Sequence, residues 1–93
     1  MPSLIKLQFD PGNGASFYVE HNGTVTRCFV DQSNAFLVKK ASPGQSFPAI
    51  FERYSDLAVA AAAINIGRKG VSTDPWGNVI TAEDFEAAQN AKR

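Results

Sequence analysis

His21 and Cys28 are the side chains best suited to acid–base or nucleophilic chemistry, and the chain has one histidine and one cysteine. A nucleophile and its base must lie within about 3 Å of each other. If Asn22 and Gly23 are the central residues of a hairpin turn, both side chains point to one face, but about two residue pairs separate them. We interpret His21 as an exposed turn residue and Cys28 as a small buried thiol. The protein is therefore expected not to be an enzyme.

The sequence offers equally few residues that could bind a metal or a cofactor. Zinc sites use about three or four His, Cys or carboxylate ligands. The one close group of acids is Glu83, Asp84 and Glu86, on the first turns of a predicted helix, where negative charge is favourable by itself. Gly12 and Gly14 follow a predicted strand but lack the third glycine of a phosphate loop and lead into another strand. We predict no metal, no cofactor and no phosphate loop.

Nine basic and nine acidic side chains give a formal charge of zero, which removes the general attraction to phosphate behind non-specific nucleic-acid binding. A local patch is still compatible with this balance, because cations and aromatic residues interleave in the middle third of the chain. The cations are Lys39, Lys40, Arg53, Arg68 and Lys69, and the aromatics are Phe36, Phe47, Phe51 and Tyr54. A small RNA- or single-stranded-DNA-binding domain is therefore the alternative interpretation.

Protein binding is the class that remains, and it is the function we predict. Tyr, Trp and Arg supply most hot spots of protein interfaces. The candidate interface residues are Tyr18, Arg27, Phe29 and Trp76, and the cations that could steer an acidic partner toward them are Lys39, Lys40, Arg68 and Lys69. The competing interpretation is structural, with Trp76 capping the core and Phe29 packed under the last helix.

Length and composition predict one soluble, cytoplasmic domain spanning residues 1–93. The chain is 44% hydrophobic and 19% charged, so it can bury a core. One cysteine cannot form an internal disulfide, which mildly favours a reducing compartment. No apolar run approaches ~18 residues, and the first residues lack the pattern of a signal peptide.

The first forty residues are predicted to be strands separated by turns. Residues 4–9 alternate, with Ile5, Leu7 and Phe9 on one face. Residues 16–20 and 24–30 form a hairpin around Asn22 and Gly23, the pair that best fits a type I′ turn. Residues 35–40 are predicted to be a fourth strand, in which Lys39 and Lys40 discourage pairing with another chain.

The hairpin turn sets which side chains share a face. His21 then lies opposite Thr24, Val19 opposite Thr26, Tyr18 opposite Arg27 and Phe17 opposite Cys28. One face suits a core and carries Phe17, Val19, Cys28 and Val30. The other is amphipathic and carries Tyr18, Glu20, Arg27 and Phe29.

Two helices are predicted in the second half of the chain. Residues 47–54 favour an extended segment over the opening turn of a helix, since Ser55 offers a better N-cap and Gly67 a stop, which predicts a main helix over Ser55 to Ile66. A connector over residues 70–78 turns back over the sheet or the helix end. A second helix runs from Thr81 to Lys92, where Thr81 and Asp84 approximate a capping box and Ile80 can pack on Phe85.

These elements predict an α+β domain in which an antiparallel β-meander of three to five strands packs against one main α-helix, with the second helix docked at an edge or end. The predicted core is Ile5, Leu7, Phe9, Phe17, Val19, Cys28, Val30, Phe36, Val38, Leu57, Ala61, Ile64 and Phe85. In size and architecture such a domain is similar to many phage and mobile-element accessory proteins, including anti-CRISPR inhibitors, although no residue match carries binding residues over. The expected function is that of a non-catalytic inhibitor or accessory subunit of a larger protein or ribonucleoprotein.

Overall fold

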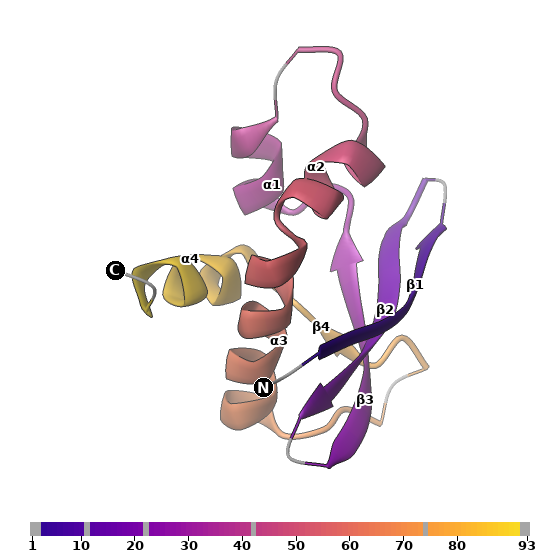
Figure 1. Cartoon of the computed structure of the whole chain (residues 1–93), viewed down its shortest axis with the longest axis vertical. Helices are drawn as coiled ribbons and strands as arrows, with labels where there is room; N and C mark the ends of the chain where they lie inside the picture. Colours follow the sequence, from indigo (N-terminus) through magenta and orange to yellow (C-terminus); the bar gives the residue numbers. More distant parts are fainter. Residues whose placement is uncertain (1–2, 11, 22, 42, 74, 92–93) are drawn as a thin grey trace.

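The computed structural model describes residues 3–10, 12–21, 23–41, 43–73 and 75–91, with the side chains of Ser3 and His21 left out. The described residues form a four-stranded mixed sheet and four helices, which confirms the α+β class. β1 (Ser3–Asp10), β2 (Gly14–His21) and β3 (Thr24–Asp31) run antiparallel, and the two-residue β4 (Asn78–Val79) pairs parallel to β3. The helices lie on one side of this sheet (Figure 1).

The hairpin of β2 and β3 has the predicted register. Tyr18 pairs with Arg27 and Phe17 with Cys28, as a two-residue turn requires. Asn22 itself lies outside the described residues. The register sends Phe17, Val19, Cys28 and Val30 toward the helices, where all four are fully buried, so the predicted core face of the hairpin is confirmed.

β1 departs from the simple alternation that the sequence predicts. Its register against β2 shifts between residues 5 and 8, and Lys6 takes a positive φ of 53°. An irregularity of this kind changes which side chains face the core. Leu4, Leu7 and Phe9 pack against the core, whereas Ile5 pairs with Tyr18 on the opposite face. The prediction that Ile5 belongs to the core is therefore wrong.

Residues 35–40 form a helix, α1 (Ala35–Lys40), and the predicted fourth strand is wrong. Asn34 decides this, because its side-chain oxygen accepts the backbone N–H groups of residues 36 and 37 and so caps the helix. Phe36 is buried as predicted, but Val38 is 55% exposed and does not belong to the core. Lys39 and Lys40 occupy the last helical turn, where they meet the negative end of the helix dipole and protect no strand edge.

The segment predicted to be extended is also helical, as α2 (Phe47–Arg53). Ser46 caps it by accepting the backbone N–H of Ala49, and Pro48 sits in the first turn, where its missing N–H costs nothing. Tyr54 is the single residue between α2 and the next helix, α3 (Ser55–Lys69). Ser55 begins this helix, but the cap position is Tyr54, which makes no side-chain cap bond.

α3 is the main helix and runs one turn beyond its predicted end. Gly67 continues the helix, and Gly70 ends it with a φ of 74° while donating its N–H to the carbonyl of Ile66. Leu57 and Ala61 are buried as predicted, and Ile64 is half-buried against the core. Ala58 and Ala62 are also fully buried, and α3 contacts β2.

α4 (Ala82–Ala91) begins with the predicted capping box. The Thr81 hydroxyl accepts the N–H of Asp84 at 3.3 Å, and the Asp84 carboxylate accepts the N–H of Thr81 at 3.0 Å. Ile80 and Phe85 are both buried. The helix packs on α3 and α1, so its support comes from other helices more than from an edge of the sheet.

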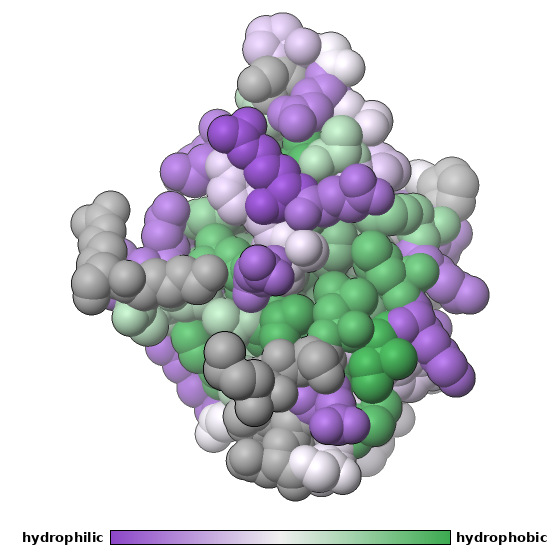
Figure 2. All heavy atoms as spheres, viewed as in Figure 1, coloured by the Kyte–Doolittle hydropathy of each residue, from purple (hydrophilic) through white to green (hydrophobic). Residues whose placement is uncertain are grey.

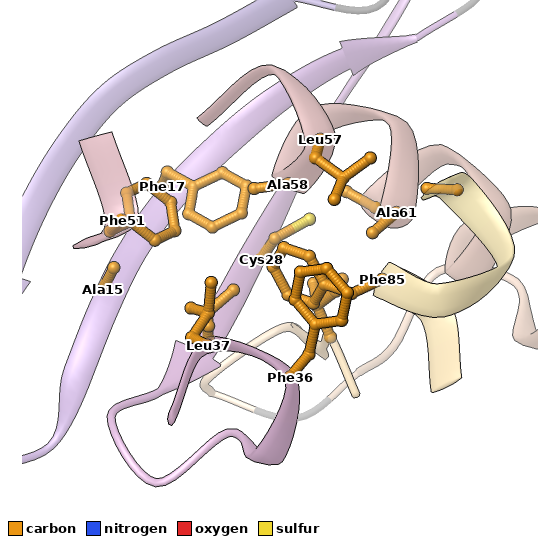
Figure 3. Close-up of a cluster of buried hydrophobic side chains, with 14 of the residues drawn as sticks. Ala15, Phe17, Cys28, Phe36, Leu37, Phe51, Leu57, Ala58, Ala61 and Phe85 are labelled. Carbon is orange, nitrogen blue, oxygen red and sulfur yellow. The ribbon is translucent and has the colours of Figure 1, made fainter. Parts of the chain in front are cut away.

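The core lies between the sheet and the four helices and is rich in aromatic rings (Figure 3). Phe36 of α1 stacks on Phe85 of α4 with ring centroids 5.2 Å apart, and Phe17 of β2 meets Phe51 of α2 at 5.6 Å. Cys28 lies in the same cluster. Ring contacts thus join α1 to α4 and α2 to the sheet.

Candidate interaction surface

The face of the sheet turned away from the helices is the candidate site. We call it the outer face, defined by Ile5, Ser16, Tyr18, Glu20, Val25, Arg27, Phe29 and Val79, together with Trp76, which lies over it. The register places these side chains together, because Tyr18 pairs with Arg27, Ser16 with Phe29, and Phe29 with Val79. Three of the four predicted interface residues therefore share this face, and the loop after α3 brings the fourth to it.

Trp76 packs on Phe29, with ring centroids 5.1 Å apart and an angle of 49° between the planes. Phe29 is left 8% exposed, while Trp76 itself is 47% exposed. Phe29 is thus buried by Trp76 on the outer face and does not lie under the last helix. Trp76 caps Phe29 outside the sheet, so neither structural alternative describes these two residues.

Gly77 lets the Trp76 loop approach β3 this closely. Its φ is 79°, which L side chains rarely adopt, and a Cβ built on it would lie 2.1 Å from the carbonyl oxygen of Arg27. Any side chain at position 77 would therefore push the loop away from the sheet. The position of Trp76 depends directly on this glycine.

Arg27 lies at the centre of the outer face. Its guanidinium carbon is 6.0 Å from the centroid of the Trp76 ring, and its Nε donates to the hydroxyl of Ser16 at 3.4 Å. Among the described residues, no carboxylate lies within 4.0 Å of the guanidinium. An exposed cation is therefore held in place by a ring and a hydroxyl while its charge has no ion-pair partner.

Several apolar side chains share the outer face with Arg27. Val25 is 54% exposed and Val79 is 46% exposed, and both share the outer face with the half-buried Ile5 and Tyr18. Single exposed apolar residues are ordinary on protein surfaces, but a contiguous group is typical of a binding site.

The predicted cations do not gather with this group. Lys39 and Lys40 stand at the end of α1, away from the loop that carries Trp76 (Figure 1), and the Lys40 ammonium lies 5.4 Å from the ring of Phe36. Arg68 pairs with Asp84 at 3.8 Å. Lys69 lines a hollow of about 430 Å³ with residues 70–73 and 77–79, which reaches the outer face at Val79.

The alternative nucleic-acid patch loses two of its stacking residues. Phe36 and Phe51 are buried in the core, so they cannot stack on bases. Phe47 and Tyr54 are half-buried, and the guanidinium of Arg53 lies 5.9 Å from the ring of Tyr54.

Cys28 and His21 are the two side chains best suited to nucleophilic or acid–base chemistry. Cys28 is fully buried, which raises the pKa of its thiol from 9.0 to about 12 and keeps it protonated near neutral pH. The side chain of His21 lies outside the described residues, so its separation from Cys28 stays a prediction. No three His, Cys, Asp or Glu side chains come together as possible metal ligands within the described ranges.

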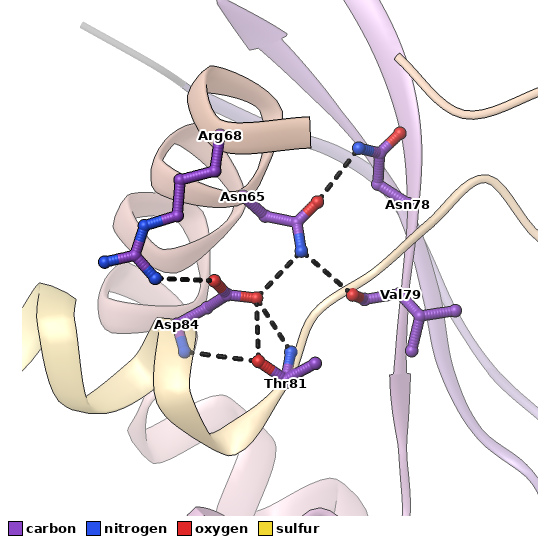
Figure 4. Close-up of polar contacts among 6 residues, drawn as sticks. All are labelled: Asn65, Arg68, Asn78, Val79, Thr81 and Asp84. Atoms are coloured by element: carbon purple, nitrogen blue, oxygen red, sulfur yellow. Dashed lines mark hydrogen bonds and ion pairs between the residues drawn. The ribbon is translucent and has the colours of Figure 1, made fainter. Parts of the chain in front are cut away.

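Sequence reasoning missed a buried polar network that anchors the Trp76 loop (Figure 4). Asn65 of α3 donates to the carbonyl of Val79 at 3.0 Å and to the Asp84 carboxylate at 2.8 Å, and its own oxygen accepts Asn78 at 2.9 Å. Asn78 also donates to the carbonyl of Gly70 at 2.7 Å and accepts the N–H of Ser72 at 2.9 Å. Both ends of the segment over residues 70–79 are thereby fixed to α3.

The network is complete within itself. Asn65, Asn78 and Asp84 are 1 to 3% exposed, and no buried side-chain nitrogen or oxygen of the described residues lacks a hydrogen-bond partner. Buried polar groups that are all satisfied stabilise a fold and leave no free ligand atoms. We therefore assign these residues to positioning Trp76, two residues before Asn78.

A second apolar surface lies where the core opens at the edge of the sheet. Figure 2 shows hydrophobic side chains gathered over β1 and beside α3. Leu4, Leu7 and Phe9 of β1 are half-buried and pack against the core. The irregularity at Lys6 breaks the strand edge, and such breaks oppose pairing with another chain.

Comparisons with known proteins give no further assignment. No family model, no curated protein and no solved structure matches the chain. None of the helices in the described part is long and apolar enough to span a bilayer.

Proposed function

We propose that this protein is a non-catalytic binding domain whose outer face docks onto a larger protein or ribonucleoprotein, as an inhibitor or accessory subunit. One observation carries the proposal, which is the packing of Trp76 on Phe29 and beside Arg27, on the side of the sheet opposite the helices. Hot spots of protein interfaces are enriched in these residue types and cluster at the centre of an apolar patch.

The structure fixes the position of Trp76 without burying it. Trp76 is held over β3 by the close approach of Gly77 and by the Asn65–Asn78 hydrogen bond, yet the residue stays 47% exposed. A ring that is fixed but exposed loses little conformational freedom when it binds. This supports a role for Trp76 as a rigid anchor in a protein complex.

A protein partner fits this surface better than a nucleic acid. The formal charge is zero, and on the outer face the acid Glu20 accompanies Arg27. The proposal includes action in the cytoplasm, as a single unpaired cysteine favours. The inhibitor role in this proposal rests on the resemblance in size and architecture to phage accessory proteins.

Affinity capture with tagged protein from the native cell tests the proposal. We expect a partner that is captured in stoichiometric amount by the wild type and lost with Arg27→Glu and with Trp76→Ala. Arg53→Glu is the matched control, since Arg53 also lies beside an aromatic ring but on α2, and it should capture the partner fully. Circular dichroism should find all variants folded.

Two results would contradict the proposal. One is a partner that binds both outer-face variants as well as it binds the wild type. The other is binding of single-stranded RNA or DNA that weakens steeply with rising salt, with no captured protein, which would establish the alternative.

A further inference from the structure

Resting on the proposed function, we infer that the outer face recognises an acidic segment of its protein partner, in which one carboxylate meets Arg27 and flanking apolar side chains cover Trp76 and Val79. The charge and the surroundings of Arg27 point to this chemistry.

The guanidinium of Arg27 is held in one orientation and can accept an anion as an ion-pair partner. Ser16 accepts from its Nε at 3.4 Å and the Trp76 ring lies 6.0 Å away, so the group is oriented by two neighbours that carry no charge. Within the described part of the chain no carboxylate pairs with it. Arginine terminal N–H groups match a carboxylate, and such charge-assisted bonds are stronger than neutral ones.

The neighbours of Arg27 favour a single carboxylate over a polyanion. Glu20 shares the outer face, since it lies two residues from Tyr18 on β2, and Tyr18 pairs with Arg27. A phosphate backbone would bring several negative charges against this acid and find few cations beside Arg27.

Apolar surroundings strengthen the contact and define what borders the carboxylate. Val25, Trp76 and Val79 are each about half exposed on the outer face that carries Arg27. When a partner covers them, water leaves and the ion pair acts in a lower dielectric. The segment should therefore carry apolar residues on both sides of its acid.

Fluorescence of Trp76, the one tryptophan of the chain, gives a direct readout. The probe is a capped five-residue peptide with one glutamate between two leucines and a serine at each end. The same peptide with glutamine in place of glutamate is the neutral control. We expect the glutamate peptide to change Trp76 emission and to bind about tenfold more tightly than the glutamine peptide.

Variants separate this contact from simple apolar binding. Arg27→Gln should lower the affinity for the glutamate peptide to that for the glutamine peptide, while Arg53→Gln leaves it unchanged. Arg27→Glu should prefer a peptide with lysine in place of glutamate, and this exchange of charge requires a folded protein. Equal binding of the glutamate and glutamine peptides, no binding of either, or tighter binding of a ten-nucleotide oligo-dT would overturn the inference.

The captured partner distinguishes this inference from the proposed function. If Trp76→Ala releases the partner and Arg27→Gln does not, the outer face binds protein but not through a carboxylate. If neither variant releases it, the proposed function fails as well.

Discussion

The side-chain amide of Asn65 donates to the carboxylate of Asp84 at 2.8 Å, in the interior of the protein and 19 positions away along the chain. The same carboxylate oxygen accepts the N–H and the hydroxyl of Thr81, each at 3.0 Å, and the other oxygen faces Arg68 at 3.8 Å. A buried carboxylate is tolerated only when its oxygens are satisfied in this way. The contact joins α3 to α4, and the further bonds of Asn65 to Val79 and Asn78 add β4 to the same point.

Replacing Asp84 should destabilise the protein strongly. Asp84→Ala removes the capping box and leaves the Asn65 amide with one acceptor fewer, so we expect a loss of about 3 kcal/mol in the free energy of unfolding. Glu83→Ala removes an exposed acid from the same helical turn and should cost less than about 1 kcal/mol. Urea denaturation measures both, and similar losses would show that the buried network adds nothing.

Asn34 should matter more than an ordinary helix cap. Its oxygen caps α1, and its amide nitrogen donates to the carbonyl of Ile80 at 3.2 Å, 46 positions later. We expect Asn34→Ala to lower the free energy of unfolding by about 2 kcal/mol, the sum of a cap and a buried hydrogen bond. Ser46→Ala, which removes only the cap of α2, should cost about 1 kcal/mol or less in the same denaturation experiment. Equal costs would mean that the bond to Ile80 contributes nothing.

A side chain at position 77 should displace Trp76. Gly77→Ala combines an unfavourable φ with a collision against the backbone of Arg27, so a cost of about 3 kcal/mol and a change in Trp76 emission are expected. Gly44→Ala tests the φ contribution alone, because Gly44 has the same φ of 79° with no atom within 4 Å of the added Cβ. It should cost about 1 kcal/mol and leave the emission unchanged. Normal emission from a folded Gly77→Ala protein would contradict this account of the loop.

Burial of Cys28 makes stability depend on alkaline pH. Because the pKa of the thiol is raised from 9.0 to about 12 in the folded protein, the unfolded chain loses the proton first. The stabilisation is fully present below pH 9 and is lost as pH rises toward 12. The difference in unfolding free energy between wild type and Cys28→Ala should therefore shrink over this interval.

Thiol reactivity gives an independent measurement. At pH 8 the buried, protonated Cys28 should react with a disulfide reagent only after urea unfolds the chain. Rapid reaction of the native protein would place the thiol at the surface.

Local signals in the sequence predicted the elements that depend on local contacts. The Asn22–Gly23 pair fixed the hairpin register, and thereby placed Tyr18, Arg27 and Phe29 on one face. Thr81 and Asp84 likewise predicted the start of α4, because a capping box is formed by residues three apart. The candidate site was predictable to this extent.

α1 and α2 were predicted wrongly because each is about two turns long and shows little periodicity. The deciding signals were Asn34 and Ser46, which stand before the helices as N-caps. The irregularity at Lys6 has no sequence signal, since alternating residues on either side of it read as one continuous strand.

Asn65 could have been found from spacing. It lies four and seven positions after Ala61 and Ala58, so it shares the buried face of α3 with them. Nothing in the sequence indicates that Asn78 and Asp84 would meet it, because their contacts depend on how the connector folds back. The packing of Trp76 on Phe29 has no sequence signal for the same reason.

The parallel pairing of Phe29 with Val79 also constrains the order in which the molecule can assemble. During synthesis the first three strands leave the ribosome long before the segment that completes the sheet, so the edge of β3 and the ring of Phe29 stay open to other chains in the meantime. Closing a loop that contains three helices carries an entropic cost that the earlier hairpins do not. The nascent chain therefore exposes the edge of β3 and the ring of Phe29 until residues 76–79 have been made.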